Sequence, residues 1–144
     1  MTGPSSFLNR RRVYSSILVG TACACFLYSI TLWNRFMQTQ PRTAEPAKGA
    51  IYPMNNHGWY YYLSATQADQ MMILRYSAFG FGLFAFVTKA PELAKKPWEL
   101  YQSVSDISWT HFWRSVILSA AAAWLLSPYL ASFLASKGVV FDPW

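Results

Sequence analysis

The apolar residues of this chain gather into three long blocks, which charged and proline-containing stretches separate. The first block covers residues 13–34 and the third covers residues 115–136, and each holds 22 residues without a charge. About 20 helical residues, each rising 1.5 Å, cross the roughly 30 Å hydrocarbon layer of a membrane. The first and third blocks therefore predict two membrane-spanning helices.

The middle block is interrupted by a single charge. Between Asp69 and Lys89 lie 19 residues, of which only Arg75 is ionised. Arg75 sits near the start of the block, where a long side chain can snorkel toward the lipid headgroups. We therefore expect a single-domain, all-α integral membrane protein over residues 1–144, with spans at about 13–34, 65–89 and 108–136.

The segment between the first two spans is polar and then rich in aromatic residues. Residues 38–50 are predicted to form a polar linker. The turn signal "NNHG" at residues 55–58 lies between two short apolar or aromatic stretches, which predicts a small surface hairpin over residues 51–63. Ser64 and Gln67 match the capping box S-x-x-Q, so the next helix is expected to start near Ala65.

Aromatic side chains gather at the expected ends of the spans, where amphipathic rings are enriched between water and lipid. Between the second and third spans, "PWELYQSVSD" places Pro97 at a first helical position and apolar residues three apart, which predicts a short interfacial helix. The expected interfacial anchors are Trp59, Tyr60, Tyr61, Tyr62, Trp98, Trp109 and Trp113.

Small residues recur at every fourth position of the third span, and shorter sets of the same kind occur in the other two. Stripes of small side chains let helix backbones approach closely in lipid. Pro128 removes one backbone donor and favours a kink in the third span. The expected packing residues are Ser115, Ser119, Ala123, Ser127, Ala131 and Ala135, with Ser16, Gly20 and Ala24 in the first span and Ala78 and Gly82 in the second.

The composition agrees with a membrane protein. Hydrophobic residues make up 53% of the chain, and charged residues make up 12%, about half the share in an ordinary soluble domain. The net charge of +6 is not accompanied by an aromatic and basic stripe that reads nucleic acid. We assign it to topology and to anionic phospholipids, and expect other membrane subunits as partners, with no nucleic acid and no small-molecule substrate.

The chain carries few groups with chemistry, and we expect no catalytic residue, no cofactor and no metal. Cys23 and Cys25 are two residues apart on a helix and point about 200° from each other, so they cannot close on one ion. His57 and His111 are weak cofactor-binding candidates on opposite sides of the membrane, more typical of a turn and of a hydrogen-bonded interfacial group. Proton pumps place acidic residues at membrane depth. The six acidic residues of this chain are expected outside the three apolar blocks: Glu45, Asp69, Glu92, Glu99, Asp106 and Asp142.

Basic residues indicate the orientation. Seven lie on the side of the N-terminus and of the second loop, and five lie on the other side. By the positive-inside rule the N-terminus is expected in the mitochondrial matrix or the cytoplasm, with the C-terminus opposite. The leading residues, rich in Ser and Arg and free of acid, are typical of mitochondrial import, whereas "NRRRVY" and "ACA" also fit a bacterial export signal.

In general form, a small, aromatic-rich chain with several spans and a basic N-terminus resembles the supernumerary subunits that surround respiratory-chain complexes. The resemblance implies a non-catalytic accessory subunit of an energy-transducing complex, with the mitochondrial inner membrane favoured and the bacterial cytoplasmic membrane as the alternative. Two other functions remain open: an electron-transfer subunit in which a histidine binds haem or pigment, and a bacterial membrane assembly or immunity factor.

Overall fold

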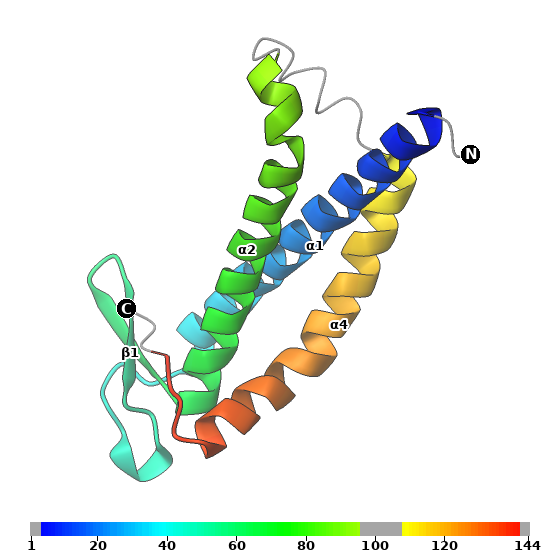
Figure 1. The fold of residues 1–144 in the computed structure, drawn as a ribbon. Helices are drawn as coiled ribbons and strands as arrows, with labels where there is room; N and C mark the ends of the chain where they lie inside the picture. Colours follow the sequence, from blue (N-terminus) through cyan, green and yellow to red (C-terminus); the bar gives the residue numbers. More distant parts are fainter. Residues whose placement is uncertain (1–3, 96–107, 142–144) are drawn as a thin grey trace.

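The structure, a computed structural model, describes residues 4–95 and 108–141 and is mostly helical. Within these residues, α1 (Pro4–Thr39) leads through the short 3-10 helix η1 (Pro46–Lys48) to the strands β1 (Tyr52–Asn56) and β2 (Trp59–Leu63). The helices α2 (Ala65–Lys95) and α4 (Trp109–Ser136) follow. Figure 1 shows α1 and α4 running in one direction and α2 in the other, with the hairpin at the end where α2 begins.

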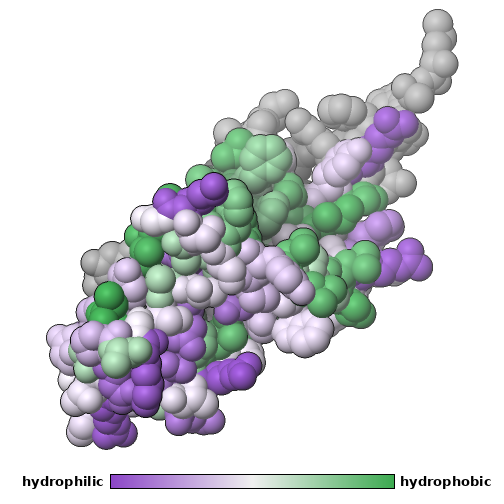
Figure 2. All heavy atoms as spheres, turned by 90° about the horizontal axis from the view of Figure 1, so that it is seen from below, coloured by the Kyte–Doolittle hydropathy of each residue, from purple (hydrophilic) through white to green (hydrophobic). Residues whose placement is uncertain are grey.

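Each long helix contains a stretch that is long and apolar enough to cross a membrane. These stretches are Arg12–Thr39, Ala65–Thr88 and Trp109–Ser136. The expectation of three long apolar helices is thereby confirmed. Seen from below, hydrophilic residues gather over the hairpin end at the lower left, and hydrophobic residues lie along the helices (Figure 2). The predicted interfacial helix and its Trp98 fall outside the described residues.

The connection from α1 to the hairpin is held by its own short-range contacts. The predicted polar linker starts later than expected because α1 continues through Thr39. Glu45 pairs with Ala50 in an isolated β-bridge, and its carboxylate lies 2.7 Å from Nζ of Lys48. The hydrogen bond and the charge of Glu45 raise the pKa of Lys48. The β-bridge and the ion pair therefore fold residues 45–50 into a small closed loop.

A tight antiparallel hairpin follows. Its register pairs Met54 with Tyr61 and Asn56 with Trp59, which leaves a two-residue turn of His57 and Gly58. Both turn residues have positive φ, 51° and 88°, as the turn that matches strand twist requires. The side-chain oxygen of Asn55 accepts a hydrogen bond of 2.9 Å from the backbone N–H of Gly58. The sequence "NNHG" therefore closes the hairpin through local chemistry.

The start of α2 is a reciprocal capping box. The backbone N–H of Ser64 donates to Oε1 of Gln67 at 2.9 Å, and the N–H of Gln67 donates to Oγ of Ser64 at 3.4 Å. Two backbone donors that the first turn cannot satisfy internally are thus bonded. The helix begins at Ala65, and Ser64 alone separates it from the end of β2 at Leu63.

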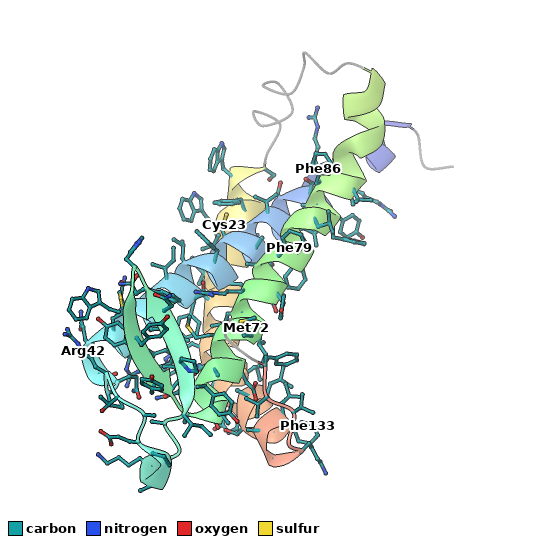
Figure 3. The ribbon with its side chains drawn as sticks, turned by 90° about the vertical axis from the view of Figure 1, so that its left-hand side faces the viewer. Cys23, Arg42, Met72, Phe79, Phe86 and Phe133 are labelled. Carbon is teal, nitrogen blue, oxygen red and sulfur yellow. The ribbon has the colours of Figure 1, made fainter. Side chains whose placement is uncertain are left out.

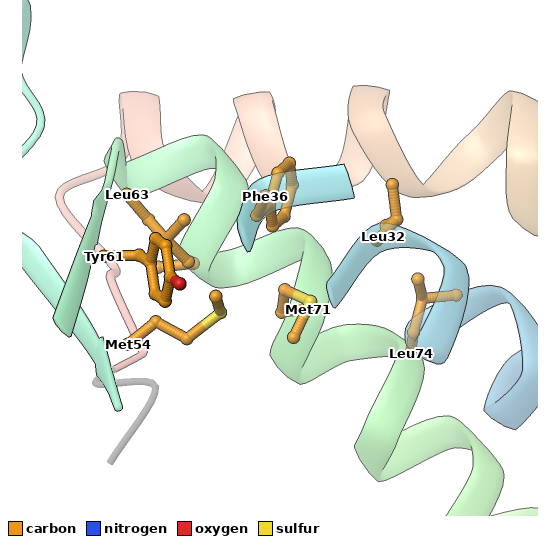
Figure 4. Close-up of a cluster of buried hydrophobic side chains, with 8 residues drawn as sticks. Leu32, Phe36, Met54, Tyr61, Leu63, Met71 and Leu74 are labelled. Atoms are coloured by element: carbon orange, nitrogen blue, oxygen red, sulfur yellow. The ribbon is translucent and has the colours of Figure 1, made fainter. Parts of the chain in front are cut away.

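The buried core lies where the hairpin meets α1 and α2. Period-two alternation along the strands turns Met54, Tyr61 and Leu63 toward the helices, and they are 0%, 7% and 0% exposed. Figure 4 shows these side chains facing residues of both helices. The helical members of the cluster are Leu32, Phe36, Ala68, Met71 and Leu74.

Candidate functional site

The helices α1 and α4 are in close contact at Gly20. A Cβ built on Gly20 would lie 2.7 Å from the carbonyl oxygen of Phe112 and would also collide with Oγ of Ser115. Only a residue without a side chain fits this position. Gly20 and Ser115, both expected to be packing residues, thus face each other across the α1/α4 interface.

Hydroxyl groups bond across the same interface on either side of Gly20. Oγ of Ser16 accepts a hydrogen bond of 3.0 Å from the backbone N–H of Ser108, at the start of α4. Thr21 and Ser119 place their hydroxyl oxygens 2.9 Å apart. Such bonds hold helices together in lipid, where apolar burial supplies little drive for helix association.

Small residues are also buried farther along α1 and α4, toward their C-terminal ends. Oγ of Ser127 accepts a hydrogen bond of 3.0 Å from Nε2 of Gln70, which links α4 to α2. Ala24 and Ala131 are 2% and 0% exposed, and Ala123 packs against the core cluster. The expected stripe on α4 therefore bonds to α1 at Ser119 and to α2 at Ser127.

The two packing residues expected in the second span have different surroundings within the described chain. A Cβ built on Gly82 would have nothing within 4 Å, so Gly82 packs against no other helix of the described chain. Ala78, one turn earlier, lines a groove between α2 and α1. The physical reason is the geometry of the bundle, because α2 separates from α1 and α4 toward its C-terminal end (Figure 1).

Pro128 lies inside α4 without ending it. The helix runs from Trp109 to Ser136 as one element and bends in its second half, drawn in orange in Figure 1. Because proline has no N–H to donate, the ladder loses one bond at this position. Pro128 also lines a hollow with Arg35 of α1 and Gln67 of α2, so both helices lie beside this bend.

The aromatic cluster does not act as one surface. Trp59 and Tyr60 are 59% and 48% exposed, whereas Tyr61 is buried in the core and Tyr62 is half-buried. The expectation that all four rings are interfacial anchors is corrected for Tyr61, because strand alternation turns it toward the helices. Trp109 and Trp113, at the start of α4, are exposed and accessible to an interface.

The two histidines lie far apart, because His57 lines a hollow with Trp33, whereas His111 contacts Ser108, which bonds to Ser16 near the other end of α1. His57 is exposed in the hairpin turn, and His111 lies in the first turn of α4, where its Nδ1 is 2.7 Å from Oγ of Ser108. One haem cannot contact both. Cys23 is half-buried and Cys25 is buried, and both are free thiols.

Asp69 is the ionisable group whose position differs most from the expectation. It lies within the apolar stretch of α2, is fully buried, and accepts a hydrogen bond of 2.7 Å at Oδ1 from the backbone N–H of Phe141. Its Oδ2 has no hydrogen-bond partner in the described chain. The ring of Phe141 packs edge-on against Tyr76, with centroids 6.2 Å apart. Asp69 therefore fastens the segment after α4 to the beginning of α2.

Arg75 points across the bundle. Its guanidinium carbon lies 4.7 Å from the centre of the Trp33 ring on α1. Planar guanidinium groups favour such stacking, and lysine does not reproduce it. The snorkelling side chain expected at this position is thus stacked on an aromatic residue.

No protein-family model, curated protein or solved structure matches the chain. The fold by itself defines a class: a mostly helical protein with three helices long and apolar enough to cross a membrane. These features are consistent with an integral membrane protein.

Proposed function

We propose that this chain is a non-catalytic accessory subunit of an energy-transducing membrane complex, with the mitochondrial inner membrane as its location. It acts by packing against larger membrane subunits and bracing them. The observation that carries the proposal is the second half of α2, which leaves the bundle with most of its surface uncovered.

This part of α2 combines large aromatic side chains with glycines. Phe79, Phe84 and Phe86 are 71%, 61% and 59% exposed. Neither Gly80 nor Gly82 would bring a Cβ within 4 Å of another atom. Glycine lowers the stability of a helix by about 1 kcal/mol relative to alanine, and in membrane helices it marks positions where another helix approaches closely. Gly82 shares one helical face with Phe79 and Phe86, which lie three residues before it and four residues after it. A neighbouring subunit that packs against this face accounts for both the open notch and the exposed rings.

The direct test is native electrophoresis of membranes solubilised in mild detergent, followed by mass spectrometry of the proteins that migrate with this chain. The proposal expects migration with a large respiratory assembly in stoichiometric amount. A small species that contains only this chain would refute it.

A matched pair of variants locates the contact. Gly82→Leu fills the open notch on α2, and Ala122→Leu adds the same bulk on an exposed position of α4. We expect Gly82→Leu to reduce the amount of chain in the large assembly at least several-fold, since overpacking costs about 1 to 3 kcal/mol. Ala122→Leu should be retained as wild type. Equal retention of both variants would show that this face of α2 meets lipid.

A further inference from the structure

We infer that the hollow between α1, α2 and α4 at the hairpin end binds one glycerophospholipid, whose phosphate contacts Arg35 and whose acyl chain passes along Leu125. The inference uses the membrane location that is also part of the proposed function, but it does not use the accessory role. It rests on the donors that the hollow presents, on its amphipathic lining and on its depth.

The lining of the hollow is polar on one side and apolar on the other. The hollow has a volume of about 700 Å³, and side chains of all three long helices line it. Its polar residues come from the last turns of α1 and the first turns of α2, and include Arg35 and Gln67. The apolar residues, which form the larger part of the lining, come from α1 and α4 and include Leu32 and Leu125. A mostly apolar site with a few polar groups matches a ligand that has a polar head and an apolar tail.

The hollow begins at the level of the lipid headgroups in the membrane location proposed above. Arg35 is the first charge after the uncharged run that ends at Asn34. Figure 3 shows Arg42, beside the hairpin, and Phe133, in the second half of α4, toward the same end of the bundle. From Arg35 to Tyr28 the hollow extends over two turns of α1, about 11 Å, which is most of one leaflet of the roughly 30 Å hydrocarbon layer. A lipid with its phosphate at Arg35 therefore has room for an acyl chain along the hollow.

Arg35 and Gln67 both present N–H groups that lack an acceptor within the described chain. Arg35 is exposed, and its guanidinium makes no ion pair, hydrogen bond or aromatic stack with another described residue. Its charge acts on the hydroxyl of Tyr28, which lines the same hollow. Oε1 of Gln67 accepts from the backbone N–H of Ser64, which leaves its amide nitrogen to donate elsewhere.

The charge of the hollow favours a phosphate. Among the described residues, no acidic side chain lines it. The planar fork of a guanidinium matches the oxygens of a phosphate and bonds them at two points. A lipid phosphate at the headgroup level therefore satisfies Arg35 and leaves the amide of Gln67 as a second donor.

The experiment is a lipid titration of the purified full chain in detergent, read by native mass spectrometry. Phosphatidylglycerol and diacylglycerol with identical acyl chains are added in parallel, and the apparent Kd of the first bound lipid is measured. We expect the wild type to bind phosphatidylglycerol about tenfold more tightly, which corresponds to about 1.4 kcal/mol. The purified chain is used alone, so the result is independent of the electrophoresis that tests the accessory role.

Two variants test the phosphate contact. Arg35→Gln should reduce the preference for phosphatidylglycerol to less than about twofold. Its matched control, Arg114→Gln, removes the same charge from an exposed position of α4 outside the hollow and should keep the wild-type preference. Gln67→Glu should also lose the preference, because its carboxylate repels a phosphate, while glutamate still serves in the capping box with Ser64. Circular dichroism of each variant checks that the helices are kept.

A second pair of variants tests the acyl chain. Leu125→Ala shortens a side chain that lines the hollow, and Leu118→Ala makes the same change at an exposed position of α4 outside it. We expect Leu125→Ala to weaken the binding of both lipids by about threefold, because apolar contact with the chain is lost. Leu118→Ala should weaken neither.

Three results would overturn the inference. Equal affinity of the wild type for both lipids would remove the role of the phosphate. Displacement of phosphatidylglycerol by millimolar glycerol 3-phosphate would show a site for a soluble phosphate ester. Unchanged lipid binding by Leu125→Ala would show that no acyl chain lies in the hollow, and loss of that variant from a native complex would identify the occupant as a partner helix.

Discussion

Replacing Gly20 with alanine tests the close contact between α1 and α4. An ordinary contact of a Cβ begins near 3.4 Å, and a Cβ at position 20 would lie 2.7 Å from the carbonyl oxygen of Phe112. The carbonyl belongs to the backbone of α4 and cannot rotate away. The two helices would therefore have to separate locally by about 0.7 Å, a gap that forfeits roughly a quarter to a half of each dispersion contact.

The expected cost follows from two opposing terms. Overpacking of a tight contact destabilises by about 1 to 3 kcal/mol. Alanine is the better helix former by about 1 kcal/mol, which offsets part of the loss. The separation also lengthens the neighbouring contact of Thr21 with Ser119, now 2.9 Å, beyond hydrogen-bond range. We expect Gly20→Ala to lower the free energy of unfolding by about 1 to 2 kcal/mol.

The measurement is reversible unfolding in mixed micelles, titrated with a denaturing detergent and followed by circular dichroism. Gly82→Ala is the matched control, because the same added methyl group meets nothing within 4 Å and should leave stability unchanged or raise it by up to about 1 kcal/mol. Ser115→Ala removes one of the two colliding groups, so its combination with Gly20→Ala should cost less than the sum of the single changes. Equal stability of Gly20→Ala and Gly82→Ala would refute the assigned contact.

Three further changes probe other parts of the fold. Asp69→Ala should cost about 1 to 3 kcal/mol by leaving the N–H of Phe141 without its acceptor, and hydrogen exchange at that amide should accelerate; unchanged exchange would contradict the contact. Tyr61→Asp should destabilise strongly, by about 3 kcal/mol or more, whereas Tyr60→Asp should change thermal stability by less than about 1 kcal/mol, and similar losses for both would contradict the burial difference. Ser127→Leu should lower stability in the micelle titration by about 1 to 3 kcal/mol, and a neutral result would place this position away from α2.

Features that depend on neighbouring residues could be read from the sequence. Uncharged runs of about 20 residues give long apolar helices because length and hydropathy are local properties. The capping pair Ser64 and Gln67 acts across one helical turn, and the turn at His57 and Gly58 acts across two residues. Spacing of four along a helix likewise predicts which small residues share a face. Gly20 and Ser115 belong to such sets, and the structure brings them together.

Features that depend on how the elements are placed could not be read in this way. The same small-residue pattern occurs at Gly82, but there the helices have already separated, and no local signal reports their crossing point. Tyr61 resembles its neighbours in sequence, and its burial follows from the strand register. In the sequence, Asp69 resembles a polar residue at the boundary of a span. Its partner Phe141 lies 72 residues away, so the neighbouring residues give no sign that Asp69 is buried. The sequence does contain one indication of such a partner: a carboxylate at the edge of an apolar block, with no basic residue one helical turn away.

The bond between Asp69 and Phe141 has a consequence for the order in which the chain can assemble. A ribosome makes Asp69 first, and the amide that satisfies its Oδ1 is made 72 residues later. During that interval α2 carries a carboxylate that is costly to bury in lipid. The burial of Asp69 is therefore complete only after Phe141 has been made. For a chain whose α2 spans a membrane, as proposed above, the final position of α2 would thus depend on the completion of α4.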